Sequence, residues 1–111
     1  MTINEILEKL SVLDVKKKRS HEEGYLELVF FKKDINAWER ELKKIMGQAQ
    51  KPFGKKPSAE HGNLAKPYGG IRANQALYQK SFGTYGAIAM IWPWGNGQHM
   101  TLKLALVDNV A

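Results

Sequence analysis

Residues 87–107 read AIAMIWPWGNGQHMTLKLALV, and this stretch decides the fold. An unbroken apolar run from Ala87 to Trp92 is typical of a strand that is buried on both faces. Gly95-Asn96-Gly97 has the composition of a hairpin turn, and residues 98–107 beyond it place a methionine or leucine at every second position. The stretch therefore predicts a hairpin of two antiparallel strands, 87–92 and 98–107.

Two more strands are predicted outside this hairpin. Residues 25–31 read YLELVFF, with apolar residues on both alternating faces, which favours a central position in the sheet. Residues 71–82 fit neither the helical nor the strand period cleanly, and we predict a strand over about 75–82 whose start the pattern does not define. The four segments together predict a mostly antiparallel sheet of about four strands.

Two segments carry their apolar residues at the 3.6-residue spacing of an amphipathic helix. We expect helices over about 3–13 and 35–46, and Thr2 and Glu5 have the spacing of a capping box at the start of the first. The apolar stripes consist of Ile3, Ile6, Leu7, Leu10 and Leu13 in one segment and of Ile35, Trp38, Leu42, Ile45 and Met46 in the other. Because each stripe must be buried, we expect an α+β fold in which both helices pack on one face of the sheet.

The composition is that of one compact domain over residues 1–111. Hydrophobic residues make up 43% of the chain and charged residues 25%, so a packed core is expected rather than disorder. The chain contains no cysteine, which excludes disulfides, thiol nucleophiles and thiolate zinc sites. The N-terminus does not resemble a secretory signal, and no apolar run approaches the ~20 residues of a membrane-spanning helix. We therefore expect a cytoplasmic protein with no membrane partner.

Residues 48–70 are predicted to form a long irregular loop, because proline and glycine leave no room for a regular element. These residues are Pro52, Gly54, Pro57, Gly62, Pro67, Gly69 and Gly70. Loops of this length are uncommon inside a compact domain and are usually functional or mobile. The loop is therefore the first place to look for a binding site.

Nearly all of the formal net charge of +6 lies in the central third of the chain. Residues 47–81 hold six cations against a single carboxylate, Glu60, whereas residues 1–46 and 82–111 are close to neutral. Aromatic residues lie among these cations, and single-stranded nucleic acid is recognised by that combination, because cations neutralise phosphates and rings stack on bases. The predicted polyanion-binding residues are Lys51, Phe53, Lys55, Lys56, Lys66, Tyr68, Arg72 and Lys80.

Each basic segment also has a simpler interpretation. Lysine-rich loops are often solvated surface, and Phe53 and Tyr68 could instead fasten the loop to the core. Gly69-Gly70 before Arg72 could cradle an anion, but a tight turn leading into a strand is the favoured interpretation. The basic run of residues 16–19 is flanked by carboxylates and is predicted to be a solvated turn. No segment matches a named nucleic-acid-binding module.

Trp92 and Trp94 lie on either side of Pro93, just before the hairpin turn, and suggest a second kind of surface. Their rings either cap the core of the sheet or present an anchor to a protein partner, since tryptophan is enriched at interface hot spots. Capping is the favoured interpretation. The alternative function is a protein–protein interaction module, including a homodimer, that uses this end of the sheet and exposes at least one of the two indoles.

The sequence carries no catalytic motif that assigns an enzyme class. His21, His61 and His99 are far apart, and their acidic neighbours do not have the spacing of a known metal site. We therefore predict no catalytic residue, no metal and no cofactor. The best prediction is a small non-enzymatic domain that binds nucleic acid or an acidic protein through residues 51–80, and an enzyme of unrecognised type is the third interpretation.

Overall fold

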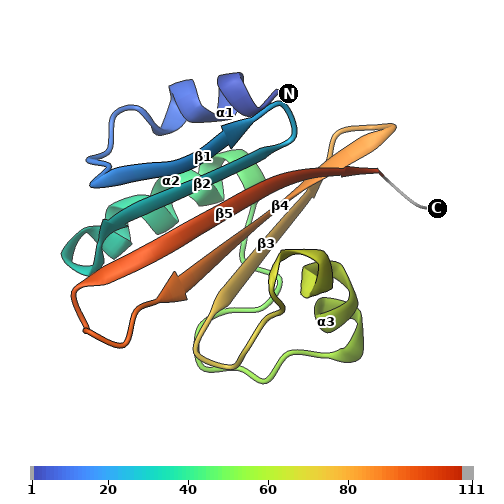
Figure 1. Cartoon of the computed structure of the whole chain (residues 1–111). Coiled ribbons are helices and arrows are strands. Elements are labelled where there is room, and N and C mark those ends of the chain that lie inside the picture. Colours follow the sequence, from blue (N-terminus) through green and yellow to red (C-terminus); the bar gives the residue numbers. More distant parts are fainter. Residues whose placement is uncertain (1, 109–111) are drawn as a thin grey trace.

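The computed structural model describes residues 2–108, which form an α+β fold of three helices and a five-stranded antiparallel sheet (Figure 1). The helices are α1 (Ile3–Leu10), α2 (Ile35–Met46) and α3 (Ala59–Ala65), with short 3₁₀ helices η1 (Lys32–Asp34) and η2 (Lys66–Tyr68). The strands are β1 (Lys17–Glu22), β2 (Tyr25–Phe31), β3 (Ala76–Ser81), β4 (Tyr85–Pro93) and β5 (His99–Asp108). Their spatial order is β1-β2-β5-β4-β3, and the predicted fold class is confirmed.

The β4–β5 hairpin forms where the sequence predicts it, with Leu102 paired to Ile91 in the antiparallel ladder. The Asn96 side chain closes the turn, because its Oδ1 accepts from the backbone N–H groups of Gln98 at 2.9 Å and His99 at 3.2 Å. Short polar side chains favour turns for this reason. The hairpin therefore brings the residues on either side of the turn next to each other.

α1 and α2 cover one face of the sheet, and α2 lies behind the sheet in the view of Figure 1. The Trp38 ring of α2 stacks on Phe30 of β2, with the ring centres 4.4 Å apart, and both side chains are fully buried. Aliphatic side chains from both helices and from β2, β3, β4 and β5 complete this core. The predicted packing of two helices on one face is confirmed, and α2 has the predicted bounds.

α1 begins as predicted and ends earlier. Thr2 and Glu5 form the predicted capping box, in which each satisfies a backbone N–H of the other. The helix ends at Leu10 rather than near residue 13, because the amide and the hydroxyl of Ser11 both donate to the Glu8 carbonyl and close a tighter turn.

β1 corrects the prediction that the basic run of residues 16–19 is a solvated turn. It is one of the two edge strands of the sheet and pairs with β2, with Lys18 opposite Leu28 and His21 opposite Leu26. Nearly all of its residues are exposed, so it lacks the apolar alternation by which a strand is predicted. Charged side chains are typical of an edge strand, because they discourage pairing with other chains. The sheet therefore has five strands rather than four.

α3 corrects the prediction of an irregular loop over residues 48–70. Ser58 caps the helix: its hydroxyl accepts from the His61 amide at 3.2 Å, and its own amide donates to His61 Nδ1 at 3.1 Å. Histidine in place of glutamate or glutamine is outside the usual capping-box pattern, and glycine interrupts the helix sequence. The sequence therefore shows only helix-breaking residues in this segment and no recognisable start of a helix.

α3 and η2 lie on the opposite face of the sheet from α1 and α2. Ala65 and Ile71 pack there with Leu77, Met90 and other apolar residues of β3, β4 and β5. In Figure 1 this layer lies beside β3, while β1, β2 and most of β5 are not covered by a helix on that side. No helix within residues 2–108 is long and apolar enough to cross a membrane.

Candidate functional site

Lys51, the first cation of the predicted site, is a structural residue and is only 1% exposed. Its backbone bridges to Leu77 of β3, and its ammonium donates to the carbonyls of Pro52 and Ala73 at 2.9 Å and to that of Gln75. Burial lowers the pKa of this ammonium. Lys51 thus ties together the two ends of segment 52–75 and does not present its charge to a ligand, which corrects the prediction for this residue.

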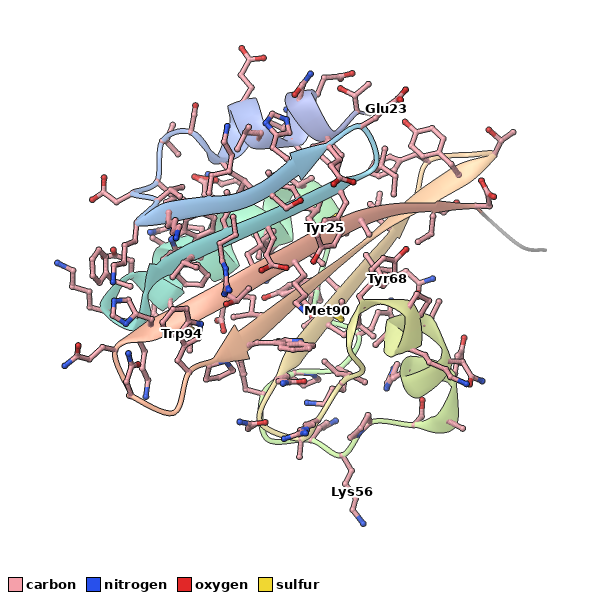
Figure 2. All side chains as sticks on the ribbon, in the orientation of Figure 1. Glu23, Tyr25, Lys56, Tyr68, Met90 and Trp94 are labelled. Atoms are coloured by element: carbon pink, nitrogen blue, oxygen red, sulfur yellow. The ribbon has the colours of Figure 1, made fainter. Side chains whose placement is uncertain are left out.

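The other predicted residues of segment 51–80 lie on different sides of the sheet. Phe53 is half-buried against the core beneath α2, and Lys80 lies on that same side because it pairs with Ala87. Tyr68 packs on the opposite side. The remaining predicted cations are exposed and are Lys55, Lys56, Lys66 and Arg72. Figure 2 shows Lys56 projecting away from the sheet. The structure does not gather the predicted residues into one surface.

A denser cluster of aromatic and basic side chains lies on the face that α1 and α2 leave free. We call this surface the open sheet face. Its rings are those of Tyr25, Phe31, Tyr68, Trp92, Trp94 and His99, and its cations are Lys16, Arg19, Lys33 and Lys103. Figure 2 is viewed from this side, with Tyr25 and Tyr68 near one another and Trp94 toward the β4–β5 turn.

At one end of the open sheet face, Tyr25 of β2 stacks on Tyr68 of η2 with ring centres 6.0 Å apart and ring planes 8° from parallel. The Tyr25 hydroxyl donates to Glu27 Oε1 at 2.7 Å, and Arg19 of β1 lies 3.5 Å from the other Glu27 oxygen. Burial, with the charge and hydrogen bond of Glu27, raises the pKa of Tyr25 well above its usual value of 10.0. Glu27 is thus already engaged by two partners.

In the middle of the open sheet face, the Lys103 ammonium lies 3.6 Å above the centre of the Trp92 ring and donates to the Tyr68 carbonyl at 2.9 Å. Burial lowers the pKa of Lys103. Gly69 makes this arrangement possible, because a Cβ atom there would lie 2.5 Å from Trp92 Cη2. The Gly69 backbone also has φ of +102°, a conformation that side-chain-bearing residues rarely adopt.

At the other end, Trp94 folds back over β5, and its Nε1 donates to Thr101 Oγ1 at 2.8 Å. Its ring lies 5.0 Å from that of His99, which in turn lies 5.3 Å from Phe31 of β2. Trp94 remains 37% exposed. The ammonium groups of Lys16 and Lys33 lie 5.8 Å and 5.6 Å from the centre of the Phe31 ring. Two cations therefore lie over one ring of a three-ring cluster at this end.

The open sheet face combines positive charge with aromatic rings, the two features that an anionic and flat ligand would contact. The Glu27 carboxylate, which lies beside this cluster, is held by Tyr25 and Arg19. The rings of the open sheet face are fixed by neighbouring rings and hydrogen bonds, so little side-chain entropy would be lost on stacking. No group of three or more histidine or acidic side chains within residues 2–108 is placed to hold a metal ion.

Sequence reasoning identified Tyr68, Trp92 and Trp94 as candidates and missed the other members of the open sheet face. The missing signal was partly readable, because residues 25, 27, 29 and 31 share one side of a strand and residues 99, 101 and 103 share one side of another. The pairing of β2 with β5, which joins Phe31 to His99, could not be read from the sequence. One indole is exposed, as the interaction hypothesis requires.

No family model, curated protein or solved structure matches the chain.

Proposed function

We propose that this protein is a small binding domain that holds single-stranded nucleic acid on the open sheet face. The observation that carries the proposal is the cluster of rings contributed by β2, β4, β5 and η2, with ammonium groups lying over the rings of Phe31 and Trp92. Single-stranded nucleic acid needs both features, because its unpaired bases stack on aromatic rings while its phosphates are neutralised by lysine and arginine. A sheet surface can offer several bases a ring at once.

The arrangement favours nucleic acid over a protein partner because of its charge. A protein interface typically has an apolar core from which lysine is depleted. Here the ammonium groups of Lys16 and Lys33 lie 5.8 Å and 5.6 Å from the centre of the Phe31 ring, and that of Lys103 lies 3.6 Å from the centre of the Trp92 ring. An acidic protein would satisfy the charges but would not use the ring faces. The exposed cations of segment 51–80 fit the same proposal, since they add attraction at longer range.

A salt titration of oligonucleotide binding tests the proposal. A fluorescently labelled single strand of about 12 nucleotides, as DNA and as RNA, is followed by anisotropy from about 20 mM to 200 mM salt. We expect Trp94→Ala to weaken binding by ~1–3 kcal/mol without changing the salt slope, because it removes a stacking surface and no charge. Replacing Lys16 and Lys33 together with alanine should flatten the slope.

The matched control is the pair Lys55→Ala and Lys56→Ala, which removes two exposed lysines from the basic loop. We expect a smaller change in slope than for the pair at Lys16 and Lys33. If the Lys55 and Lys56 pair changes the salt slope more, and Trp94→Ala leaves the affinity unchanged, then the binding site lies in segment 51–80. The proposal that the open sheet face binds nucleic acid would then be wrong. Self-association that depends on Trp94, with no oligonucleotide binding at low salt, would support the homodimer instead.

A further inference from the structure

His99 lies in an unusual polar environment at the Trp94 end of the open sheet face. The residue is only 9% exposed, and both of its ring nitrogens are within hydrogen-bond distance of a neighbouring nitrogen. Nε2 lies 2.8 Å from the Lys16 ammonium, and Nδ1 lies 2.7 Å from Asn96 Nδ2. An ammonium and a side-chain amide nitrogen are both donors and cannot accept a hydrogen bond.

The orientation of the Asn96 amide is fixed by the hairpin turn. Its Oδ1 accepts from two backbone amides, those of Gln98 and His99, so turning the amide over would leave both amides facing a donor. Both His99 nitrogens thus face donors, and a neutral ring has a single acceptor nitrogen, so either tautomer leaves one donor facing another. In the tautomer with its proton on Nε2, Nδ1 accepts from the fixed Asn96 amide and the Nε2–H group faces the Lys16 ammonium at 2.8 Å.

His21 shows what a satisfied lysine–histidine contact looks like in the same molecule. Its Nδ1 lies 3.3 Å from the Lys18 ammonium, while its Nε2 lies 2.8 Å from Asn4 Oδ1, which is an acceptor. One nitrogen can accept from the lysine and the other can donate to the asparagine. The neutral His21 ring thus finds complementary partners on both sides, whereas His99 does not.

We infer that Lys16 and His99 form a phosphate-binding niche, in which one anionic oxygen accepts from the Lys16 ammonium and from His99 Nε2–H. An oxygen between the two groups converts the donor–donor contact into two charge-assisted or polar hydrogen bonds. Lys16 can move to admit it, because its side chain is exposed. Lys33 lies nearby over the same Phe31 ring and adds a second positive charge.

The surface beside the niche has room for the rest of a nucleotide. An open depression of about 630 Å³ is lined by Phe31, Lys32, Lys33, Gly97 and Gln98. The centre of the Trp94 ring lies 5.0 Å from that of His99. Under the proposed function, the niche is where one phosphate of the nucleic-acid backbone binds. The same two donors would also hold free inorganic phosphate. Only the identification of the phosphate as part of a nucleic acid rests on the proposed function.

The niche is tested by titrating inorganic phosphate into ¹⁵N-labelled protein and recording the ring nitrogens of all three histidines at constant pH and ionic strength. We expect the His99 Nε2 signal to move first, with His21 and His61 as internal controls. Lys16→Met should weaken phosphate binding about tenfold or more, because it removes a charge-assisted bond. It should not lower stability, since it also removes one of the two facing donors. Lys18→Met is the matched control and should leave the His99 response unchanged.

The outcomes separate the niche from the proposed function. A phosphate response of His99 without oligonucleotide binding supports the niche and contradicts the nucleic-acid proposal. Oligonucleotide binding that leaves His99 unperturbed, or a phosphate response that is the same for all three histidines, overturns the niche. An unchanged phosphate response in Lys16→Met overturns it as well, because the inferred oxygen would then have lost one of its two donors without effect.

Discussion

The two faces of the sheet are built from the same strands but differ in how far their side chains are buried. On the covered face, aliphatic side chains and the Phe30–Trp38 stack meet α1 and α2 and are almost wholly buried. On the other face, α3 and η2 cover β3 and β4, while the remainder carries rings and lysines that, apart from the buried His99, stay half-buried or exposed. Long lysine stems and aromatic rings can shield strand backbone and still present polar or flat surfaces to solvent.

The difference teaches that the covering element, more than the strand itself, decides what a sheet face can do. β2 supplies Leu28 and Phe30 to a closed core and Tyr25 and Phe31 to an accessible surface, within seven residues. An accessible face built from aliphatic residues would be an aggregation hazard. Rings fixed by ammonium groups and hydrogen bonds avoid that hazard and leave contacts that a ligand can use.

The largest expected effect contrasts one tryptophan on each face. Trp38→Ala should lower the free energy of unfolding by ~3–5 kcal/mol, because it leaves a cavity beside Phe30 in the covered core. Trp94→Ala should lower it by only about 1 kcal/mol, since the ring is partly exposed and loses one hydrogen bond to Thr101. Urea denaturation of both variants measures the difference, and comparable losses would mean that the open sheet face is part of the core.

A second contrast uses the tyrosines and alkaline pH. Tyr78, on the covered face, is 4% exposed, and burial together with the Glu39 charge raises its pKa from 10.0 to about 12. A phenol whose pKa is higher in the folded state contributes stability that is complete below pH 10.0 and is lost as the pH rises toward 12. Two pKa units correspond to about 2–3 kcal/mol of stability.

Tyr78→Phe should therefore reduce the fall in unfolding free energy above pH 10.0, measured by urea denaturation at a series of pH values. The fall should not vanish, because the pKa of Tyr25 on the open sheet face is also raised. The slopes, rather than the absolute stabilities, are compared, so a small constant effect of removing the hydroxyl does not interfere. A slope equal to that of the unmodified protein would show that Tyr78 ionises as freely when folded as when unfolded.

The strands and helices that bury apolar residues could be predicted from the sequence, because the buried residues recur at the spacing of a helix or a strand. α2 and the β4–β5 hairpin are such elements. β1 could not, because an edge strand of charged residues has no apolar face to reveal it. α3 could not either, since its cap uses His61 and it contributes Ala65 as its one buried residue.

The candidate site was only partly predictable for a different reason. Lysine counting located charge in segment 51–80, but counting cannot tell a buried lysine such as Lys51 from an exposed one such as Lys56. The open sheet face draws on β1, β2, β4, β5 and η2, and its members meet only through strand pairing. Non-local pairing of this kind has no signature in a single sequence.

The smallest expected difference is between two adjacent glycines at the boundary between the covered and the open parts of the second face. Gly69 and Gly70 have φ of +102° and +88°, so alanine at either position is strained by roughly 1–2 kcal/mol. The Gly70 position has open space, whereas a Cβ at Gly69 would lie 2.5 Å from Trp92 Cη2. We expect Gly69→Ala to cost roughly 1–2 kcal/mol more than Gly70→Ala, because the Trp92 ring must also move.

Movement of the Trp92 ring can be detected by NMR, and backbone strain at the glycine would not by itself produce the same signal. The ring current of Trp92 should shift the ε-methylene protons of Lys103 upfield, since the ammonium lies 3.6 Å from the ring centre. Gly69→Ala should abolish that shift and weaken oligonucleotide binding, while Gly70→Ala should preserve both. If the two variants lose the same stability and keep the same Lys103 shift, then the close approach of η2 to Trp92 does not position the cation. That result would contradict the view that Gly69 holds Trp92 and Lys103 in place in the middle of the open sheet face.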